Sequence, residues 1–143
     1  MYVNDNAVGG TVIAFRNNNA TTVLASAART ATVSTDFINH NGRSVAITLN
    51  ITVAPNTAST ITIAIRHKDS ISGNYVTLLT GAAILGSAVT GAVPVTNKYA
   101  VGAGITVTAN VSAADVLGRT LNVLVTHSNA DSWTYSISAD IGV

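Results

Sequence analysis

Four stretches of this chain alternate apolar and polar side chains with a period of two residues, and this pattern restricts the fold more than any other feature. The stretches are Arg43–Val53, Ser59–His67, Arg119–His127 and Ser132–Ile141. Successive side chains of a β-strand point to opposite faces, so each stretch is predicted to be a strand with one face on a core and one in solvent. A helix would scatter the same apolar residues around its circumference.

Weaker patterns predict further strands, and clusters of Asn, Gly, Pro, Ser and Asp between them predict turns. The weaker candidates are Thr11–Phe15, Thr21–Ala25, Arg29–Thr35, Tyr75–Thr80, a piece within Ala88–Val95, and Ile105–Val111. Eight to ten short strands indicate an all-β fold, a single β-sandwich of jelly-roll or immunoglobulin-like topology. The pattern does not choose between these two topologies.

The organisation along the chain is simple. Residues 1–10 are predicted to be an N-terminal arm without a core of its own, and residues 11–143 a single sandwich domain. Gly81–Gly104 is rich in Gly and Ala and alternates poorly, so apart from the weak candidate within Ala88–Val95 its structure is the least decided. Ser112–Leu117 is either a loop or a short helix, in which Ser112 would be the cap and Asp115 would lie in the first turn.

Composition excludes several classes of protein. With no cysteine, the chain has no disulfide scaffold, thiolate zinc site or cysteine nucleophile. Its net charge of +1, without a cluster of Lys and Arg, predicts no direct binding to nucleic acid or to an anionic membrane. The start, MYVNDNAVGG, does not resemble a signal peptide, and the apolar stretch Ala82–Val95 is too short and interrupted to span a bilayer.

The scarcity of charge is informative about the surface. Only 9% of residues are charged and 48% are hydrophobic, whereas a free soluble domain has a surface with roughly 25–35% charged residues. One explanation is that copies of the chain, or a larger assembly, cover much of the surface in use. The other is a surface of Ser and Thr hydroxyls, which are well solvated without charge.

Two His–Asp pairs are the nearest approach to a metal site. His67 precedes Asp69 by two residues and His127 precedes Asp131 by four, each where a predicted strand ends. A metal would need a third and usually a fourth ligand, and Asp36, Asp115, Asp140 and His40 are scattered along the chain. We therefore predict no metal site, and expect Asp69 and Asp131 to accept backbone N–H groups in tight turns.

No catalytic or cofactor-binding residues are predicted either. The chain has no G-x-S-x-G motif, and neither Gly9-Gly10 nor Gly102-Ala103-Gly104 has the lysine and setting of a phosphate loop. Its acidic residues are six aspartates without a glutamate, and a glycosidase-type carboxylate pair stays formally open. The sequence thus predicts a structural or binding protein without a cofactor, and not an enzyme.

The aromatic residues raise one alternative function, carbohydrate binding. Trp133 and Tyr135 fall on the same face of the last predicted strand, together with Ile137. We predict that they belong to the core, although in a lectin they could stack on a sugar. Tyr75, next to the turn at Gly73, is predicted to close one end of the sandwich.

Three segments resemble small β-sandwich structural proteins of tailed bacteriophages, of the head decoration (cement) type. They are DFINHNGRSVAITLNITV (Asp36–Val53), ITIAIRHKDSISGNYVTLLTGAAI (Ile61–Ile84) and TLNVLVTHSNADSWTYSISADI (Thr120–Ile141). The residues that carry the resemblance are turn and core formers: Asp69, Gly73, Tyr75, His127, Asp131 and Trp133. Residues 81–104 and the arm carry none of it.

The resemblance implies a capsid decoration protein on the virion surface, assembled in the bacterial host cytoplasm. Its partners would be the major capsid protein and further copies of itself, since such proteins often form trimers. Another virion component, such as a head fibre or tail module, is the alternative, and a carbohydrate-binding β-sandwich is a third reading.

Overall fold

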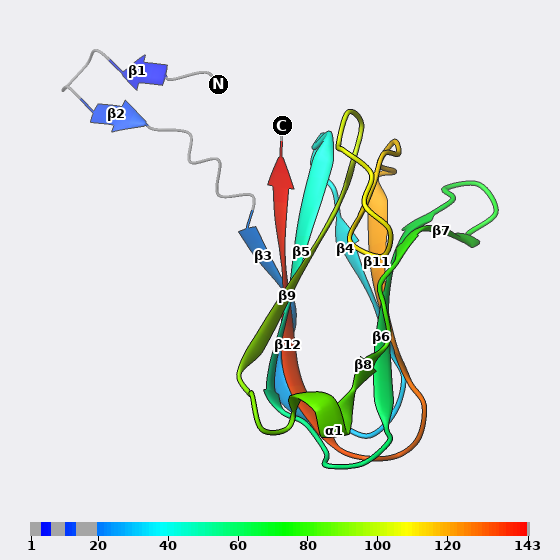
Figure 1. Cartoon of the computed structure of the whole chain (residues 1–143). Coiled ribbons are helices and arrows are strands. Elements are labelled where there is room, and N and C mark those ends of the chain that lie inside the picture. The colour runs from blue at the N-terminus through cyan, green and yellow to red at the C-terminus, as the bar shows by residue number, and fades with distance from the viewer. Residues whose placement is uncertain (1–3, 7–10, 14–19, 143) are drawn as a thin grey trace.

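The computed structural model describes residues 4–6, 11–13 and 20–142, and its main body is two five-stranded β-sheets packed face to face (Figure 1). One sheet has the order β10-β9-β5-β12-β3: Ser112–Ala113, Val95–Gly102, Ser44–Val53, Trp133–Gly142 and Ala20–Arg29. The other has the order β4-β11-β6-β7, with β8 on β6: Val33–Ile38, Thr120–His127, Thr60–Lys68, Tyr75–Thr80 and Ile84–Leu85. Strands β1 (Asn4–Asn6) and β2 (Thr11–Ile13) form a separate two-stranded sheet. The predicted all-β sandwich is confirmed.

The strand pairing decides between the two predicted topologies. Strand β3 pairs with β12, β4 with β11, β5 with β9, and β6 with β7, always antiparallel. The first of these eight strands therefore pairs with the last, the second with the seventh, and so on inward. A long antiparallel hairpin folded over on itself gives this pairing, which is the jelly roll.

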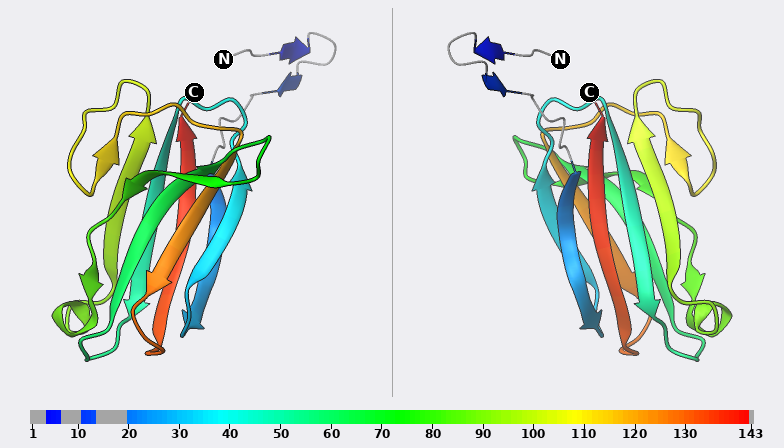
Figure 2. Two further views of the ribbon diagram at one scale, coloured as in Figure 1. Left: turned by 90° about the vertical axis from the view of Figure 1, so that its right-hand side faces the viewer. Right: turned by 90° about the vertical axis from the view of Figure 1, so that its left-hand side faces the viewer.

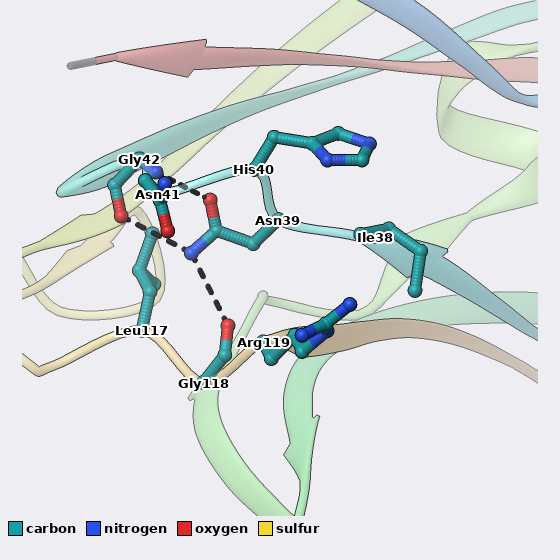
Figure 3. A pocket seen from close by; sticks show the side chains of 8 residues that line it. All are labelled: Ile38, Asn39, His40, Asn41, Gly42, Leu117, Gly118 and Arg119. Carbon is teal, nitrogen blue, oxygen red and sulfur yellow. Dashed lines mark hydrogen bonds between the residues drawn. The ribbon is translucent and has the colours of Figure 1, made fainter.

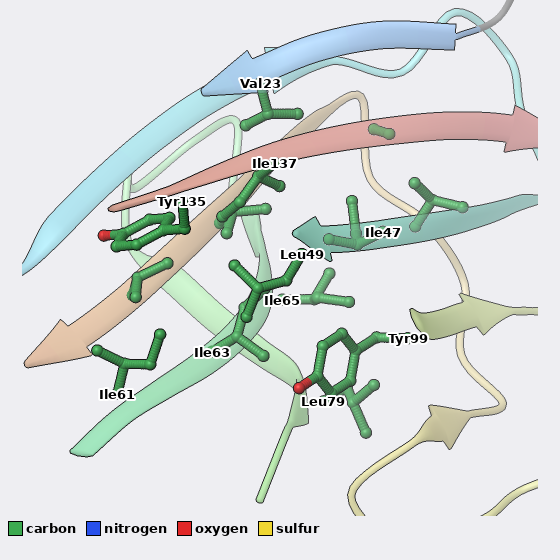
Figure 4. Packing of buried hydrophobic residues seen from close by; sticks show 14 of the residues in the cluster. Val23, Ile47, Leu49, Ile61, Ile63, Ile65, Leu79, Tyr99, Tyr135 and Ile137 are labelled. Carbon is green, nitrogen blue, oxygen red and sulfur yellow. The ribbon is translucent and has the colours of Figure 1, made fainter. Parts of the chain in front are cut away.

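The alternating strands supply the core between the sheets (Figure 4). Every second residue of β5 from Val45 to Ile51, of β6 from Ile61 to Ile65, and of β11 and β12 along their length points inward and is almost completely buried, as the period of two predicts. Burying one such aliphatic side chain contributes roughly 1.5–3 kcal/mol. The largest fully buried side chains are Trp133, Tyr135, Ile47, Leu49, Ile51, Ile61, Ile63, Ile65, Leu121, Ile137, Val45 and Val101.

Two strand predictions near the start of the sandwich were wrong in their bounds. Thr21–Ala25 and Arg29–Thr35 were predicted as separate strands, but β3 continues to Arg29 and β4 begins only at Val33. The register of β3 against β12 shifts on both sides of Ile137. Each shift moves a side chain to the other face, so the alternation that would mark one long strand is lost.

Of the two alternatives for Ser112–Leu117, a loop or a short helix, the helix is absent from the described structure. The Ser112 hydroxyl accepts a hydrogen bond from the backbone N–H of Thr108 (2.9 Å) and donates one to the carbonyl of Thr106 (2.7 Å). Its partners thus precede it, whereas a helix cap binds residues that follow. Ser112 and Ala113 instead form β10, parallel to β9.

Other parts of the weakly patterned region also differ from prediction. Ile105–Val111 is a loop, and the piece within Ala88–Val95 contains the end of a four-residue helix, α1 (Gly86–Val89), and no strand before Val95. Strand β9 was not predicted. The one described helix is far too short to cross a membrane.

The loops of the sandwich gather at its two ends (Figures 1 and 2). The upper end of the sandwich comprises the connections at residues 39–43, 69–74 and 103–119. The lower end comprises those at residues 30–32, 54–59, 86–94 and 128–132. The chain enters the sandwich at the upper end, where Ala20 of β3 pairs with Asp140 of β12. In Figure 2 no described helix or strand covers the outer face of either five-stranded sheet.

Candidate docking surface

Asp69 of the His67–Asp69 pair holds a tight turn together. The Asp69 carboxylate accepts hydrogen bonds from the Ser72 hydroxyl and from the backbone N–H groups of Ser72 (2.9 Å) and Ile71 (3.3 Å). These hydrogen bonds hold the pKa of Asp69 below its usual value, and the bond from the Ser72 hydroxyl has the largest effect. The role predicted for Asp69 is confirmed.

The role predicted for Asp131 was wrong in its detail. Its carboxylate accepts hydrogen bonds from the hydroxyl of Thr57 (2.5 Å) and the side-chain amide of Asn129 (3.1 Å), and not from backbone N–H groups. Asn129 makes the turn instead, because its Oδ1 accepts the backbone N–H of Asp131 (3.0 Å). Within the described residues, no three His, Asp, Glu or Cys side chains gather as a metal would require.

Trp133 and Tyr135 lie in the core, as predicted. Both are fully buried, and the Trp133 indole donates a hydrogen bond to the Ser59 hydroxyl (3.0 Å). A buried indole presents no face on which a sugar could stack, so Trp133 is not a lectin platform in this structure.

Tyr75 does not close an end of the sandwich, contrary to prediction. Strand pairing places it opposite Lys68, so its side chain lies on the outer face of the β4-β11-β6-β7 sheet. The Arg66 guanidinium lies 4.4 Å from the centre of its ring, and its hydroxyl donates to the Asp36 carboxylate (2.9 Å).

These side chains belong to a hydrogen-bonded network on that outer face. Asn122, which is buried there, accepts from Arg66 (2.7 Å) and donates to Asp36 (2.6 Å), and Lys68 lies 3.4 Å from Asp36. Partial burial raises the pKa of Asp36, but the hydrogen bonds from Asn122, Tyr75 and Lys68 outweigh it and the net shift is downward. One hydrogen-bonded network thus holds the three charged groups of this face, Asp36, Arg66 and Lys68.

The upper end carries the most exposed aliphatic side chains of the described structure. Ile71 is 95% exposed, Val116 72% and Val107 66%, and each lies in a loop of this end. Ile38, at the end of β4, is exposed to a smaller degree. A single exposed Val or Ile is ordinary in a small domain, so these side chains are of interest together, as candidates for contact with another protein.

A hollow of about 520 Å³ lies at the same end, between the β4–β5 turn and the segment that leads into β11 (Figure 3). Residues 38–42 and 117–119 line it, and His40 and Arg119 are exposed at its rim. Asn39 joins the two segments: its amide donates to the carbonyls of Gly42 (3.1 Å) and Gly118 (3.2 Å), and its Oδ1 accepts the Gly42 N–H (2.8 Å).

Backbone requirements fix the shape of this hollow. Asn41 has a φ of +62°, which asparagine tolerates better than most residues. A Cβ on Gly42 would collide with Ile141 and would lie 2.7 Å from Asn39 Oδ1, so only glycine fits there. The hollow is therefore preformed, as docking sites usually are.

Sequence reasoning did not find this surface. One signal was present: Ile71 is an aliphatic residue in the middle of a turn whose other residues are polar or glycine, Asp69 to Asn74. The grouping of Ile71 with Val107 and Val116 required the fold, since they come from two connections that are distant in the chain.

No protein-family model and no curated protein matches this sequence. Among the solved structures, the chain is similar to one described as "Structure of infectious bursal disease virus Gx strain". The TM-score is 0.44 and the identity 10%, over 84% of this chain and 30% of that one. The chain thus spans less than a third of the protein it matches, and so distant a likeness carries no conclusion about function.

Proposed function

We propose that this protein is a virion structural protein without catalytic activity, and more narrowly a decoration protein that binds the major capsid protein on the head of a tailed bacteriophage. The observation that carries the proposal is the set of exposed aliphatic side chains at the upper end, Ile71, Val107 and Val116. They accompany a preformed hollow on a domain with few charges. The segments that resemble phage decoration proteins support the same reading.

The upper end suits a protein partner better than a small ligand. Aliphatic side chains on separate loops give contact area without the convergent polar groups of a ligand pocket. Burying the three most exposed ones would contribute roughly 1.5–3 kcal/mol each, before the cost of association. Decoration copies that also contact one another would bind the shell through several linked contacts, so a modest energy per contact is sufficient.

The test is binding to heads of the parent phage that lack this chain. We expect the purified protein to sediment with such heads and to raise the temperature at which they break down. The variant I71S/V107S/V116S is expected to bind at least about tenfold more weakly, because it removes most of the apolar contact.

A matched control lies at the lower end. Val53 and Leu85 are exposed aliphatic residues there, so V53S/L85S changes the same kind of surface away from the proposed contact. It is expected to bind as the wild type does. Heads that neither bind nor are stabilised by the wild-type protein would refute the proposal, and equal losses from both variants would refute the assignment to the upper end.

A further inference from the structure

The outer face of the β9-β5-β12-β3 sheet differs sharply from that of the other sheet. Its side chains are those that alternate with the core residues, and nearly all are small and uncharged. On the three central strands they are Thr96, Lys98, Ala100, Ala46, Thr48, Asn50, Thr52, Thr134, Ser136, Ser138 and Asp140. A broad face of small hydroxyl and methyl groups is flat enough to pack closely against another sheet.

Two charged side chains of opposite sign stand on this face. Lys98 is paired with Thr48 of β5, and Asp140 is paired with Ala46 of the same strand from the other side. The spacing of strands places their Cα atoms about 12 Å apart, and within the described residues they make no ion pair with each other. The ion pair found in the described part of the chain, Lys68–Asp36, lies on the other sheet.

A hollow of about 270 Å³ lies beside Asp140 on this face. Ala46 and Ala100 form part of its lining because their side chains are short, and Ile105 and Gly142 continue it, so the lining is mainly apolar with the carboxylate at one side. Such a site fits a lysine, whose methylene stem packs on apolar surface while its ammonium reaches a carboxylate. Lys98 of the same chain is not among the lining residues.

We infer that this face is a two-fold interface with a second copy of the chain. Lys98 of each copy enters the hollow over Ala46 of the other and pairs with Asp140 there. Lys98 and the hollow lie on the same face of the chain, so a two-fold relation between the copies lets both make this contact reciprocally. That geometry closes at two copies and does not generate a three-membered ring.

The available area is consistent with a specific dimer. Four strands of about ten residues present a face of about 650 Å² per copy. The total, about 1,300 Å², lies in the lower part of the range for specific interfaces. The inference goes beyond head binding and does not rest on it, since it concerns the outer face of a sheet and not the exposed side chains of Ile71, Val107 and Val116.

The test is a charge exchange read out by light scattering or native mass spectrometry across a dilution series. The wild type is expected to be a dimer. K98D and D140K alone are each expected to weaken dimerisation about tenfold or more, because each places like charges together in both contacts. The double variant K98D/D140K restores opposite charges and is expected to recover most of the affinity.

Two further variants keep the test decisive. R119D makes the same change of charge at the upper end and is expected to leave the dimer intact. T48R places a large side chain at the centre of the face and is expected to give a folded monomer, as circular dichroism would verify. A wild type that stays monomeric or forms trimers, or a dimer that K98D and T48R leave unchanged, would overturn the inference. Either outcome would leave head binding by the upper end to be judged separately.

Discussion

His127 Nε2 lies 3.1 Å from the hydroxyl of Tyr135, inside the lower part of the sandwich. The Arg29 guanidinium covers the Tyr135 ring at 4.6 Å from its centre and donates to the Tyr135 carbonyl (2.6 Å). Burial, and then the charge of Arg29, lowers the pKa of His127. Burial raises the pKa of Tyr135 to about 12, against the opposing effect of Arg29. Both side chains are therefore held neutral around neutral pH.

This arrangement predicts that the protein loses stability on mild acidification. The pKa of His127 is lower in the folded than in the unfolded chain, so the unfolded state binds the proton more readily once the pH falls below about 6.5. The free energy of unfolding should then decrease as the pH falls from about 7 to about 5. Urea titrations at several pH values would measure this, with H127Q expected to show a shallower dependence. Equal slopes for both proteins would contradict the prediction.

Ser59→Ala is expected to destabilise the fold by about 1–3 kcal/mol. The buried Ser59 hydroxyl accepts from the Trp133 indole and donates to Asn129 Oδ1 (2.8 Å), and alanine would leave both groups without this partner. Trp133 is the only tryptophan in the chain, so its fluorescence reports unfolding directly. Ser70→Ala, at an exposed turn, is the control and should change stability little. Equal stabilities of the two variants would show that the buried bond contributes nothing.

Gly42→Ala is expected to destabilise the protein by about 1–3 kcal/mol and to distort the hollow at the upper end. The added methyl group would collide with Ile141, and Asn39, which joins the two lining segments, would have to move. Gly91→Ala is the matched control, because a Cβ there meets no atom within 4 Å. Thermal unfolding of both variants measures the difference, and a Gly42→Ala protein as stable as the control would refute the packing argument.

Replacing the exposed aliphatic side chains of the upper end should leave stability unchanged. Ile71, Val107 and Val116 bury little surface in the isolated chain, so I71S/V107S/V116S is expected to unfold within about 0.5 kcal/mol of the wild type. Urea unfolding followed by Trp133 fluorescence would measure this. A large destabilisation would mean that these residues support the fold, and that any loss of head binding could not be attributed to contact.

The sequence predicted the central strands of both sheets because one face of each is buried along its whole length. Strands β5 and β12 alternate strictly, and the structure buries every inward residue from Val45 to Ile51 and from Trp133 to Ile141. Toward the edges of the sheets, the alternation in the sequence matches the burial of side chains less closely. Strand β9 turns Asn97 inward together with Tyr99 and Val101, so its apolar pattern is broken by one polar residue and it was not predicted.

The arrangement of side chains on the surface could not be predicted, because it depends on contacts between residues that are distant in the sequence. The Asp36 network brings together β4, β6, β7 and β11, and the exposed side chains of the upper end come from loops whose proximity follows from the jelly-roll pairing. Tyr75 was placed at an end of the sandwich because it follows a turn, yet its pairing with Lys68 directs it to the outer face.

The most direct test of the central claim is the copy number of this chain in purified particles of the parent phage, measured by quantitative mass spectrometry against the major capsid protein. A decoration protein should be present in numbers comparable to the major capsid protein. A few copies per particle would instead indicate a tail or fibre component, and absence from the particle would contradict a virion role altogether.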